Sequence, residues 1–390
     1  MVDTNQCIEL TKQWAEINSH SYNLAGLAKM LEQIKAQYQQ SFQDIEIEEL
    51  EVPDQITVDE VGNELKIPLG KSLSIRRINT KPDAIPILLM GHMDTVFPID
   101  SDFQTCSMID KQTMGGPGVA DLKGGLVVML KALELFEASD QAGSIAWQVF
   151  INADEEIGSP GSQTLFPEIA KRNKVGLIYE PGLSDGSIAY RRKGVGNFTV
   201  IARGKAAHVG REFKQGASAI VALADFITAT NKLNSDSLII NFGAIEGGGP
   251  LNAVPDRASL GINIRVEDQG DIDHANQELE RIIKEINQTE NIELSLHGKF
   301  NRKPKIPNQE LENLYSLIET CAKELNLAIS KRDTGGCCDG NNLFEHGLVN
   351  IDTLGVRGGK IHSPEEFTCI DSFEERINLS LAILKKLSKT

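Results

Sequence analysis

Two chemically active side chains, His92 and Asp94, come directly after the apolar run Ile85–Met90. In an extended chain, residues two positions apart lie on the same side. The Asp94 carboxylate can therefore accept the second ring N–H of a metal-bound His92, which would fix the tautomer and raise the basicity of the imidazole. A capped strand end with a surface histidine is the alternative interpretation.

Further acidic residues stand at the ends of other predicted elements. Asp121 lies between the loop Gly115–Gly118 and an apolar helical pattern, where a helix N-cap is the ordinary interpretation. Three consecutive acids end the next apolar run, and one acid ends the run after it: Asp154, Glu155, Glu156 and Glu180. Adjacent acids in a cleft repel one another unless a cation or shared protons compensate. The clustering therefore favours a cation site over unrelated caps and surface acids.

A late histidine, His362, adds a further ligand type to this set. Imidazole together with carboxylate suits zinc better than calcium, which prefers oxygen ligands, or an iron–sulfur cluster, which needs thiolates. The candidates outnumber the ligands of one tetrahedral catalytic zinc. Two metals that share one carboxylate would account for five ligands and leave one glutamate as a base, as in two-metal hydrolases.

The segments that carry these residues alternate between short apolar runs and longer helical patterns. The runs include residues 85–90, 145–151 and 175–179, whereas residues 122–136 show a helical pattern. Buried strands between covering helices predict an α/β fold with a mainly parallel sheet. Ligands of such sheets sit beyond the carboxyl ends of the strands, where the loops of interest lie.

The pattern changes between residues 194 and 303. Strand-like and helical segments follow there in the order β-α-β-β-α-β, which predicts a ferredoxin-like α+β unit. Residues 301–307, with two prolines and basic side chains, predict a linker. We therefore expect one catalytic domain formed by residues 1–193 and 304–390, with residues 194–303 inserted into it.

The overall charge excludes some classes of partner. The 39 basic and 55 acidic residues give a formal net charge of −16, which would repel nucleic acids and anionic membranes. A small anionic substrate remains compatible, because a local cluster of arginine, histidine or metal outweighs a diffuse field within about 8–10 Å. Six cysteines without C-x-x-C spacing predict reduced thiols in a cytoplasmic protein. Because no signal peptide or membrane-spanning run is visible, we expect no membrane association.

Seven short motifs occur in order along nearly the whole chain: Gly91-His-Met-Asp-Thr-Val96, Asp121-Leu-Lys-Gly124, Asp154-Glu-Glu-Ile-Gly-Ser159, Glu180-Pro181, Gly204-Lys-Ala-Ala-His-Val-Gly210, Asn252-Ala-Val-Pro255 and Gly359-Lys-Ile-His362. Together they resemble the zinc exopeptidase and deacylase family of glutamate carboxypeptidases, acetylornithine deacetylase, succinyl-diaminopimelate desuccinylase and aminoacylase. Agreement of seven motifs in sequence and order makes this resemblance specific. It implies a zinc-exopeptidase-like catalytic domain with an inserted lid and dimerisation domain.

The resemblance also implies a role for each site residue. Asp121 would bridge two Zn²⁺ ions, for which Co²⁺ or Mn²⁺ are possible substitutes. The other implied ligands are His92 and Glu180 for one ion, and Glu156 and His362 for the other. Glu155 would be the general base, and Asp94 the catalytic partner that orients His92.

In the inserted unit, the resemblance implies substrate contacts by His208, Asn252 and Arg265. His208 resembles a lid histidine that reaches the substrate in the partner subunit, so a homodimer through this unit is also implied. Asn252 and Arg265 are similar to residues that contact the substrate carbonyl and carboxylate. The sequence leaves the direction of Arg265 open, and a surface arginine paired with Glu267 or Asp268 is the alternative.

Two features depart from the family pattern. The loop before Asp121 reads Gly-Gly-Pro-Gly where relatives often carry Gly-Arg-Gly, so an arginine contact is absent here. Cys337 and Cys338 stand beside Asp339, where serine or threonine is usual. These cysteines are either packing residues or thiols near the site that are sensitive to oxidation or metals.

The leading hypothesis is a di-zinc hydrolase that cleaves a peptide or N-acyl amide bond next to a free carboxylate, in a small anionic peptide or N-acyl amino acid. Residues 334–339 and 354–363 resemble the glutamate carboxypeptidase branch. A deacylase of the acetylornithine deacetylase or succinyl-diaminopimelate desuccinylase type is the alternative. A non-catalytic binding or scaffold protein is the remote alternative; loss of the base would mark it, and Glu155 is present.

Overall fold

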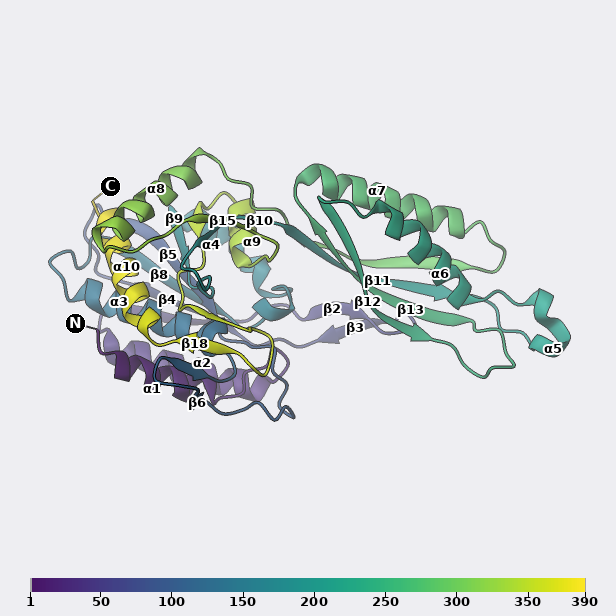
Figure 1. The fold of residues 1–390 in the computed structure, drawn as a ribbon, viewed down its shortest axis with the longest axis horizontal. Coiled ribbons are helices and arrows are strands. Elements are labelled where there is room, and N and C mark those ends of the chain that lie inside the picture. Colours follow the sequence, from purple (N-terminus) through teal and green to yellow (C-terminus); the bar gives the residue numbers. More distant parts are fainter. Residues whose placement is uncertain (1, 390) are drawn as a thin grey trace.

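The computed structural model describes residues 2–389, which form two bodies side by side, with both ends of the chain on the larger one (Figure 1). A six-stranded sheet in the order β1-β4-β8-β5-β9-β16 runs through the larger body. Its strands are β1 (Ile45–Leu50), β4 (Ser72–Arg77), β8 (Ile145–Asn152), β5 (Ile85–His92), β9 (Val175–Ile178) and β16 (Asn350–Ile351). The pairs from β8 to β16 are parallel, whereas β1 and β4 pair antiparallel. The predicted α/β fold with a mainly parallel sheet is confirmed.

Both faces of β5 are buried, which explains its continuous run of apolar residues. Ile87 and Leu89 pack into one core, and Leu88 and Met90 pack into another on the opposite face. The first core includes residues of α1 (Thr4–Ala15), α2 (Leu24–Ser41), α3 (Gly125–Glu137), α8 (Gln309–Glu324) and α10 (Asp371–Leu387). The second includes residues of α4 (Phe166–Arg172) and α9 (Asp339–Glu345).

The helix predicted over residues 122–136 begins three residues later than expected, at Gly125. Asp121 and Leu122 have non-helical backbone angles (φ −115°, ψ 89° and φ −137°, ψ 40°). The N-cap position of α3 is Gly124, so Asp121 is not the N-cap of this helix. A Cβ at Gly125 would lie 2.1 Å from the Tyr179 carbonyl oxygen. The glycine therefore lets the start of α3 approach the end of β9, which brings Asp121 towards Glu180.

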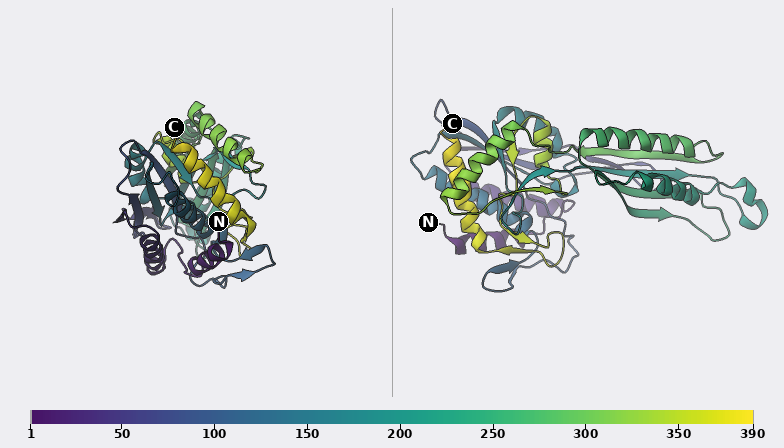
Figure 2. Two further views of the ribbon diagram at one scale, coloured as in Figure 1. Left: turned by 90° about the vertical axis from the view of Figure 1, so that its left-hand side faces the viewer. Right: turned by 45° about the horizontal axis from the view of Figure 1, so that its top comes forward.

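Residues 194–302 form the second body. Its four strands and two long helices are β11 (Gly194–Arg203), α6 (Ala219–Thr230), β12 (Leu238–Gly247), β13 (Arg257–Val266), α7 (Gln269–Ile286) and β14 (Glu293–Arg302). The sheet has the order β12-β13-β11-β14 and is antiparallel throughout. Both helices lie on one face of it, and the short helix α5 (Val209–Glu212) lies at the tip far from the larger body (Figures 1 and 2).

Buried ion pairs hold the two chain segments that connect the bodies. Arg192 and Lys305 exchange backbone hydrogen bonds, at 3.2 and 3.0 Å. Asp352 accepts from both side chains: Arg192 Nη2 lies 2.6 Å from Oδ1 and Lys305 Nζ lies 3.1 Å from Oδ2. The predicted linker 301–307 therefore contains a fully buried lysine, and its basic residues fasten it to the larger body.

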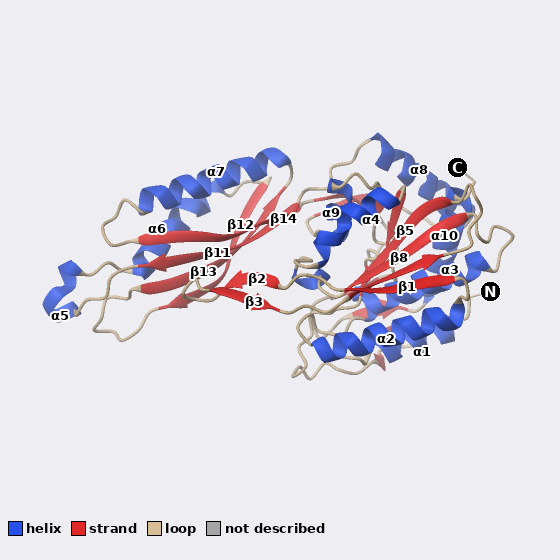
Figure 3. Ribbon diagram, turned by 180° about the vertical axis from the view of Figure 1, so that it is seen from behind, coloured by secondary structure: helices blue, strands red, loops and turns tan. Residues whose placement is uncertain are grey.

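A hairpin of β2 (Gln55–Val58) and β3 (Glu64–Ile67) reaches from the larger body along the inserted sheet (Figure 3). Arg203 Nη2 donates to the Val61 carbonyl at 3.0 Å. The remaining strands are β6 (Ser107–Met108), β7 (Thr113–Gly115), β10 (Ile188–Arg192), β15 (Lys331–Thr334), β17 (Gly358–Gly359) and β18 (Phe367–Cys369). Among the helices described, none is long and apolar enough to cross a bilayer.

We propose that residues 194–303 are a separate domain, because Leu279 and its neighbours form a core without residues of the larger body. Leu279 is fully buried. Leu279→Ala should cost about 2–5 kcal/mol of unfolding free energy and increase amide hydrogen exchange within residues 194–302 alone. Leu130→Ala, at a fully buried position of the larger body, is the matched control. Loss of protection in both bodies after Leu279→Ala would contradict the division.

Candidate active site

His92 lies at the carboxyl end of β5, and Asp94 contacts its ring at Nδ1. His92 Nδ1 is 3.1 Å from the Asp94 carbonyl and 3.3 Å from Asp94 Oδ1. Asp94 also accepts from Ser21 Oγ at 2.7 Å and from the backbone N–H groups of Glu155 and Glu156, at 3.2 and 3.1 Å. One buried carboxylate thus orients the imidazole and fixes the turn that carries both glutamates.

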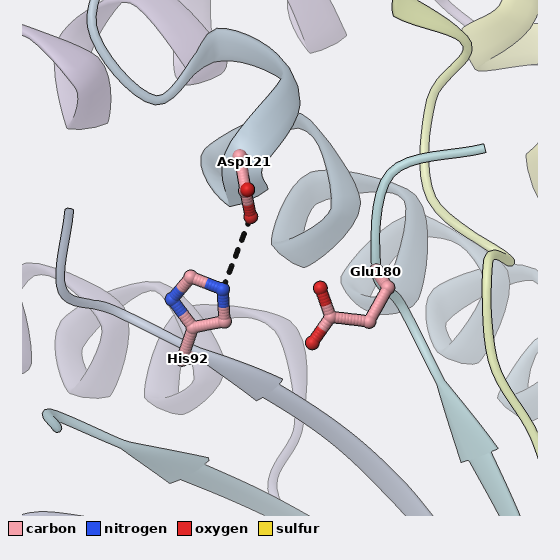
Figure 4. A group of neighbouring side chains, drawn as sticks. All are labelled: His92, Asp121 and Glu180. Carbon is pink, nitrogen blue, oxygen red and sulfur yellow. Dashed lines mark hydrogen bonds and ion pairs between the residues drawn. The ribbon is translucent and has the colours of Figure 1, made fainter. Parts of the chain in front are cut away.

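Asp121 stands between two groups of ligand-type side chains. Its Oδ1 lies 3.2 Å from His92 Nε2, and its Oδ2 lies 3.2 Å from His362 Nε2. Figure 4 shows the Asp121 carboxylate directed at the His92 ring, with the Glu180 carboxylate beside both. Ligand atoms of His92, Asp121 and Glu180 lie within 4.8 Å of one another, and so do those of Asp121, Glu156 and His362. The two groups share Asp121 alone.

The carboxylates of this cluster are in a poor environment for negative charge. Burial, reinforced by the Asp121 carboxylate, raises the pKa of Glu156, and burial likewise raises the pKa of Glu155. Burial and then repulsion from Glu155 raise the pKa of Glu180 well above its usual range. The hydrogen bond to Asp121, followed by that to Glu156, raises the pKa of His362 to about 11. The cluster therefore needs added positive charge to stay fully ionised at neutral pH.

The donor set fits divalent cations. Glu156 Oε2 lies 3.0 Å from His362 Nε2, whereas the buried Oε1 has no hydrogen-bond partner within residues 2–389. A buried oxygen without a partner costs desolvation free energy unless a cation or donor meets it. Imidazole and carboxylate together form the ligand set typical of zinc.

A second buried carboxylate, Glu366, joins the loop of His362 to the loop of Asp121. It accepts the backbone N–H groups of Gly118, Ala120 and Asp121 at 3.1, 2.9 and 2.9 Å and is 1% exposed. Sequence analysis missed this residue. Its position four residues after His362 was the available signal, but nothing in the sequence shows which backbone it caps.

The cluster opens into a cleft of about 420 Å³ between the two bodies. Its lining includes Asp121, Glu155, Glu156, Glu180, Arg192, Arg265, Arg302, Cys337 and His362. Arg265 reaches it from β13, whose even-numbered residues Ile262 and Ile264 are buried on the opposite face. Regular alternation is therefore enough to point Arg265, whose direction the sequence left open, at the cleft. Its Nε donates to Asn263 Oδ1 at 2.9 Å, not to Glu267 or Asp268.

Arg302, which sequence analysis also missed, ties the last residue of β14 to Glu155. Its Nη2 lies 2.7 Å from Glu155 Oε1 and 3.0 Å from Asp339 Oδ1, and also donates to Ser159 Oγ at 3.1 Å. In the sequence Arg302 looked like one basic residue of a linker. Only the fold shows that the linker ends against the acidic turn.

His208 and Asn252 do not lie in this cleft. Both are exposed at the tip of the inserted body, where the Val209 N–H donates to the Asn252 carbonyl at 3.0 Å. Within one chain the structure therefore gathers all the predicted residues of the catalytic domain, together with Arg265, and leaves these two apart.

A larger hollow of about 530 Å³ lies between the β2–β3 hairpin and strands β11 and β14. Glu64 and His297 are the titratable residues in its lining. It contains no cluster of ligand-type side chains like the one around Asp121, so the cleft is the candidate active site.

Comparisons with curated proteins agree with the geometry. The chain is 27% identical over 307 residues to carboxypeptidase G2 from Pseudomonas sp. (strain RS-16), covering 77% of this chain and 74% of the relative. It is 30% identical over 312 residues to a probable succinyl-diaminopimelate desuccinylase from Staphylococcus aureus (strain MRSA252), covering 68% of this chain and 74% of that one.

Solved structures share the fold over the whole chain. A tripeptidase from Staphylococcus aureus has a TM-score of 0.79 at 20% identity, with 100% of both chains covered. A dinuclear metal binding peptidase from family M20 of Bacillus subtilis has a TM-score of 0.69 at 13% identity, with 99% of this chain and 98% of that one covered.

The family resemblance predicted from seven motifs is confirmed, as is the prediction that the chain is an enzyme. The family model described as peptidase family M20/M25/M40 matches residues 88–386. The chain therefore belongs to peptidase family M20/M25/M40, and it is a metal-dependent hydrolase of the metallopeptidase or amidohydrolase type.

Proposed function

We propose that the protein is a di-zinc exopeptidase of the glutamate carboxypeptidase type, which cleaves a peptide or N-acyl amide bond next to a free carboxylate. The observation that carries this proposal is the position of Asp121 between two groups of ligand-type side chains, in a cleft that Arg265 also lines. Acidic and basic groups face each other there across a space large enough for a small peptide.

Five residues would hold the two ions. Asp121 would bind both, and each ion would take one histidine and one glutamate: His92 with Glu180, and His362 with Glu156. Two bound zinc ions would make a water molecule acidic enough to ionise near neutral pH and would polarise the scissile carbonyl. Asp94 fixes the His92 ring so that Nε2 faces Asp121.

Glu155 is the base in this proposal. Arg302 holds its Oε1, which leaves Oε2 to take a proton from the attacking water and pass it to the leaving nitrogen. Burial favours the protonated form, as the raised pKa of Glu155 indicates. A carboxyl group that both accepts and returns a proton needs this balance.

Arg265 would hold the substrate carboxylate. Its guanidinium faces the cleft from the inserted body, and a guanidinium binds a carboxylate through two parallel hydrogen bonds. A diffuse charge of −16 would repel such a substrate, so the attraction must come from groups inside the cleft.

An N-acyl amino acid deacylase is the second candidate. The name of the Staphylococcus aureus relative, a probable succinyl-diaminopimelate desuccinylase, favours it. Both reactions hydrolyse an amide next to a carboxylate and would use the same ligands and base.

The six cysteines are free thiols, which supports the cytoplasm as the proposed location.

The proposal is tested by a hydrolysis screen of the purified protein with zinc, cobalt or manganese added. Dipeptides and N-acylated peptides with a C-terminal glutamate should be cleaved, and removal of the metal with a chelator should abolish turnover reversibly. Faster cleavage of acetyl- or succinyl-amino acids than of any peptide would support the deacylase instead. No amide hydrolysis with any metal would contradict both.

Glu155→Gln should lower kcat by about 10²–10⁴, because general acid–base catalysis typically contributes that factor. Glutamine keeps an oxygen for Arg302, so the fold and metal content, measured by circular dichroism and elemental analysis, should not change. Glu290→Gln, on the exposed surface, is the control. A Glu155→Gln enzyme that retains more than one tenth of the wild-type rate would show that another group is the base.

Arg265→Lys should lower kcat/KM at least tenfold, about 1.4 kcal/mol of transition-state binding, for substrates with a free α-carboxylate. The same change should have little effect on amidated analogues. Arg257→Lys, on the same strand outside the cleft, serves as the matched control. Equal losses for both kinds of substrate would assign Arg265 to a structural role.

We also propose that the protein is a homodimer through the inserted body. Strand β12 ends its sheet, and it exposes Ile239 (43%) and Ile245 (60%). The opposite edge strand, β14, lies beside the β2–β3 hairpin. An exposed edge with apolar side chains is suited to pairing with its own copy. A dimer would also explain why His208 and Asn252 lie far from the cleft of their own chain.

Light scattering at micromolar concentration should show a dimer. Ile239→Glu combined with Ile245→Glu should produce a monomer with lower activity, because His208 would no longer reach a partner's substrate. Ile99→Glu, at an exposed isoleucine of the larger body, should leave the dimer intact. A wild-type monomer with full activity would refute the dimer and the role of His208 together.

A further inference from the structure

Cys337 lies in the cleft, yet the proposed hydrolysis does not use its sulfur. It belongs to the loop after β15 and lines the cleft together with Glu155, Arg265 and Arg302. The side chain is partly exposed. A thiol here is open to small molecules that enter the cleft.

The guanidinium groups of two arginines contact this sulfur. Arg265 Nη1 lies 3.4 Å and Arg302 Nη1 lies 3.8 Å from Cys337 Sγ. The arginines come from the inserted body and the thiol from the larger one, so the contact spans the cleft. Positively charged groups beside a sulfur attract anionic reagents towards it.

Arg302 also has a donor that nothing satisfies. The residue is only 6% exposed, and within residues 2–389 its Nε has no hydrogen-bond acceptor. A buried guanidinium N–H without an acceptor costs free energy that a carboxylate would recover. The unpaired N–H leaves part of the Arg302 charge without an acceptor, and Nη1 of the same guanidinium lies beside the thiol, which favours an anionic group there.

The other five cysteines are poorer candidates. Cys7, Cys106, Cys321 and Cys338 are buried, and burial raises the pKa of each thiol, as it does at the partly exposed Cys369. Less thiolate means slower thiol–disulfide exchange. Cys337 and Cys338 both line the cleft, but Cys338 is buried and Cys337 is partly exposed, so a reagent that enters the cleft should react at Cys337 first.

We propose that Cys337 is a modification site for small disulfides that carry a carboxylate, and that the adduct closes the cleft. The Cys337 sulfur attacks one sulfur of the disulfide, and a new S–S bond forms as the old one breaks. The other half leaves as a thiolate that takes up the Cys337 proton. Cys337 is oxidised, the leaving sulfur is reduced, and an added thiol reverses the exchange. Arg265 and Arg302 would hold the carboxylate of the bound half.

The test compares the rates at which 3,3′-dithiodipropionate and its dimethyl ester modify the metal-loaded protein. The protein is used in whatever oligomeric state it has when purified. Intact-mass spectrometry with peptide mapping should find one adduct per chain, at Cys337. Each rate is divided by the rate at which the same disulfide reacts with free cysteine. After this normalisation, the dianion 3,3′-dithiodipropionate should react at least tenfold faster than its ester. Cys337→Ser should abolish early labelling, Cys369→Ser should not, and Arg265→Gln should reduce the preference for the dianion.

Hydrolysis by the labelled protein should fall at least tenfold and return after treatment with a thiol. This arm alone depends on the proposed function, which is tested first on the reduced protein, so the two failures are distinguishable. Labelling of another cysteine first, equal normalised rates for the two disulfides, or an adduct at Cys337 that leaves hydrolysis unchanged would overturn the proposal.

Discussion

Buried carboxylates crowd together at the carboxyl end of the main sheet, and the groups around them must offset their mutual repulsion. Asp121, Glu155, Glu156 and Glu180 share one small space. Burial raises the pKa of the three glutamates, whereas at Asp121 the hydrogen bonds from His362 and His92 outweigh burial and lower the pKa. Such a cluster costs free energy in folding unless cations offset it. The two histidines and Arg302 offset part of it. The remainder is what bound metal would supply, so binding free energy and folding free energy are linked here.

Two further buried carboxylates, Asp94 and Glu366, hold the loops that carry this cluster in place. Asp94 holds the His92 ring and the Glu155 turn, and Glu366 holds the Asp121 loop by three backbone hydrogen bonds. Each accepts hydrogen bonds from groups far apart in the sequence. Ligands on separate loops therefore keep one geometry, which a metal centre requires.

Local sequence pattern was sufficient to predict some of the strands and side chains of the candidate site. The other features of the site depend on tertiary contacts. The apolar run ending at His92 predicted a buried strand with a histidine at its carboxyl end, because both the run and the alternation are local. The start of α3 was placed too early, since Asp121 and Leu122 are non-helical and the Asp121 N–H donates to the distant Glu366 rather than to a helix. Arg302 and Glu366 were missed for a related reason. Their partners lie 147 and 245 residues away in the chain, and no periodicity encodes such pairings.

In the inserted body, too, some features follow from local pattern and others require tertiary contacts. Its β-α-β-β-α-β order follows from alternation and helical period alone. The direction of Arg265 was left open by the sequence, although its alternation with the buried Ile262 and Ile264 accounts for it in the structure. Its contact with Cys337 required the two bodies to be placed together. The lining of the cleft thus depends on the junction between the two bodies, where Asp352 pairs with Arg192 and Lys305.

The central claim, two metal ions that share Asp121, is tested most directly by anomalous X-ray diffraction at the zinc edge from crystals of the zinc-loaded protein. We expect two peaks, each about 2.0–2.2 Å from an Asp121 oxygen. One should lie beside His92 and Glu180, and the other beside His362 and Glu156. A single peak in fully loaded crystals, or two peaks of which neither touches Asp121, would contradict it.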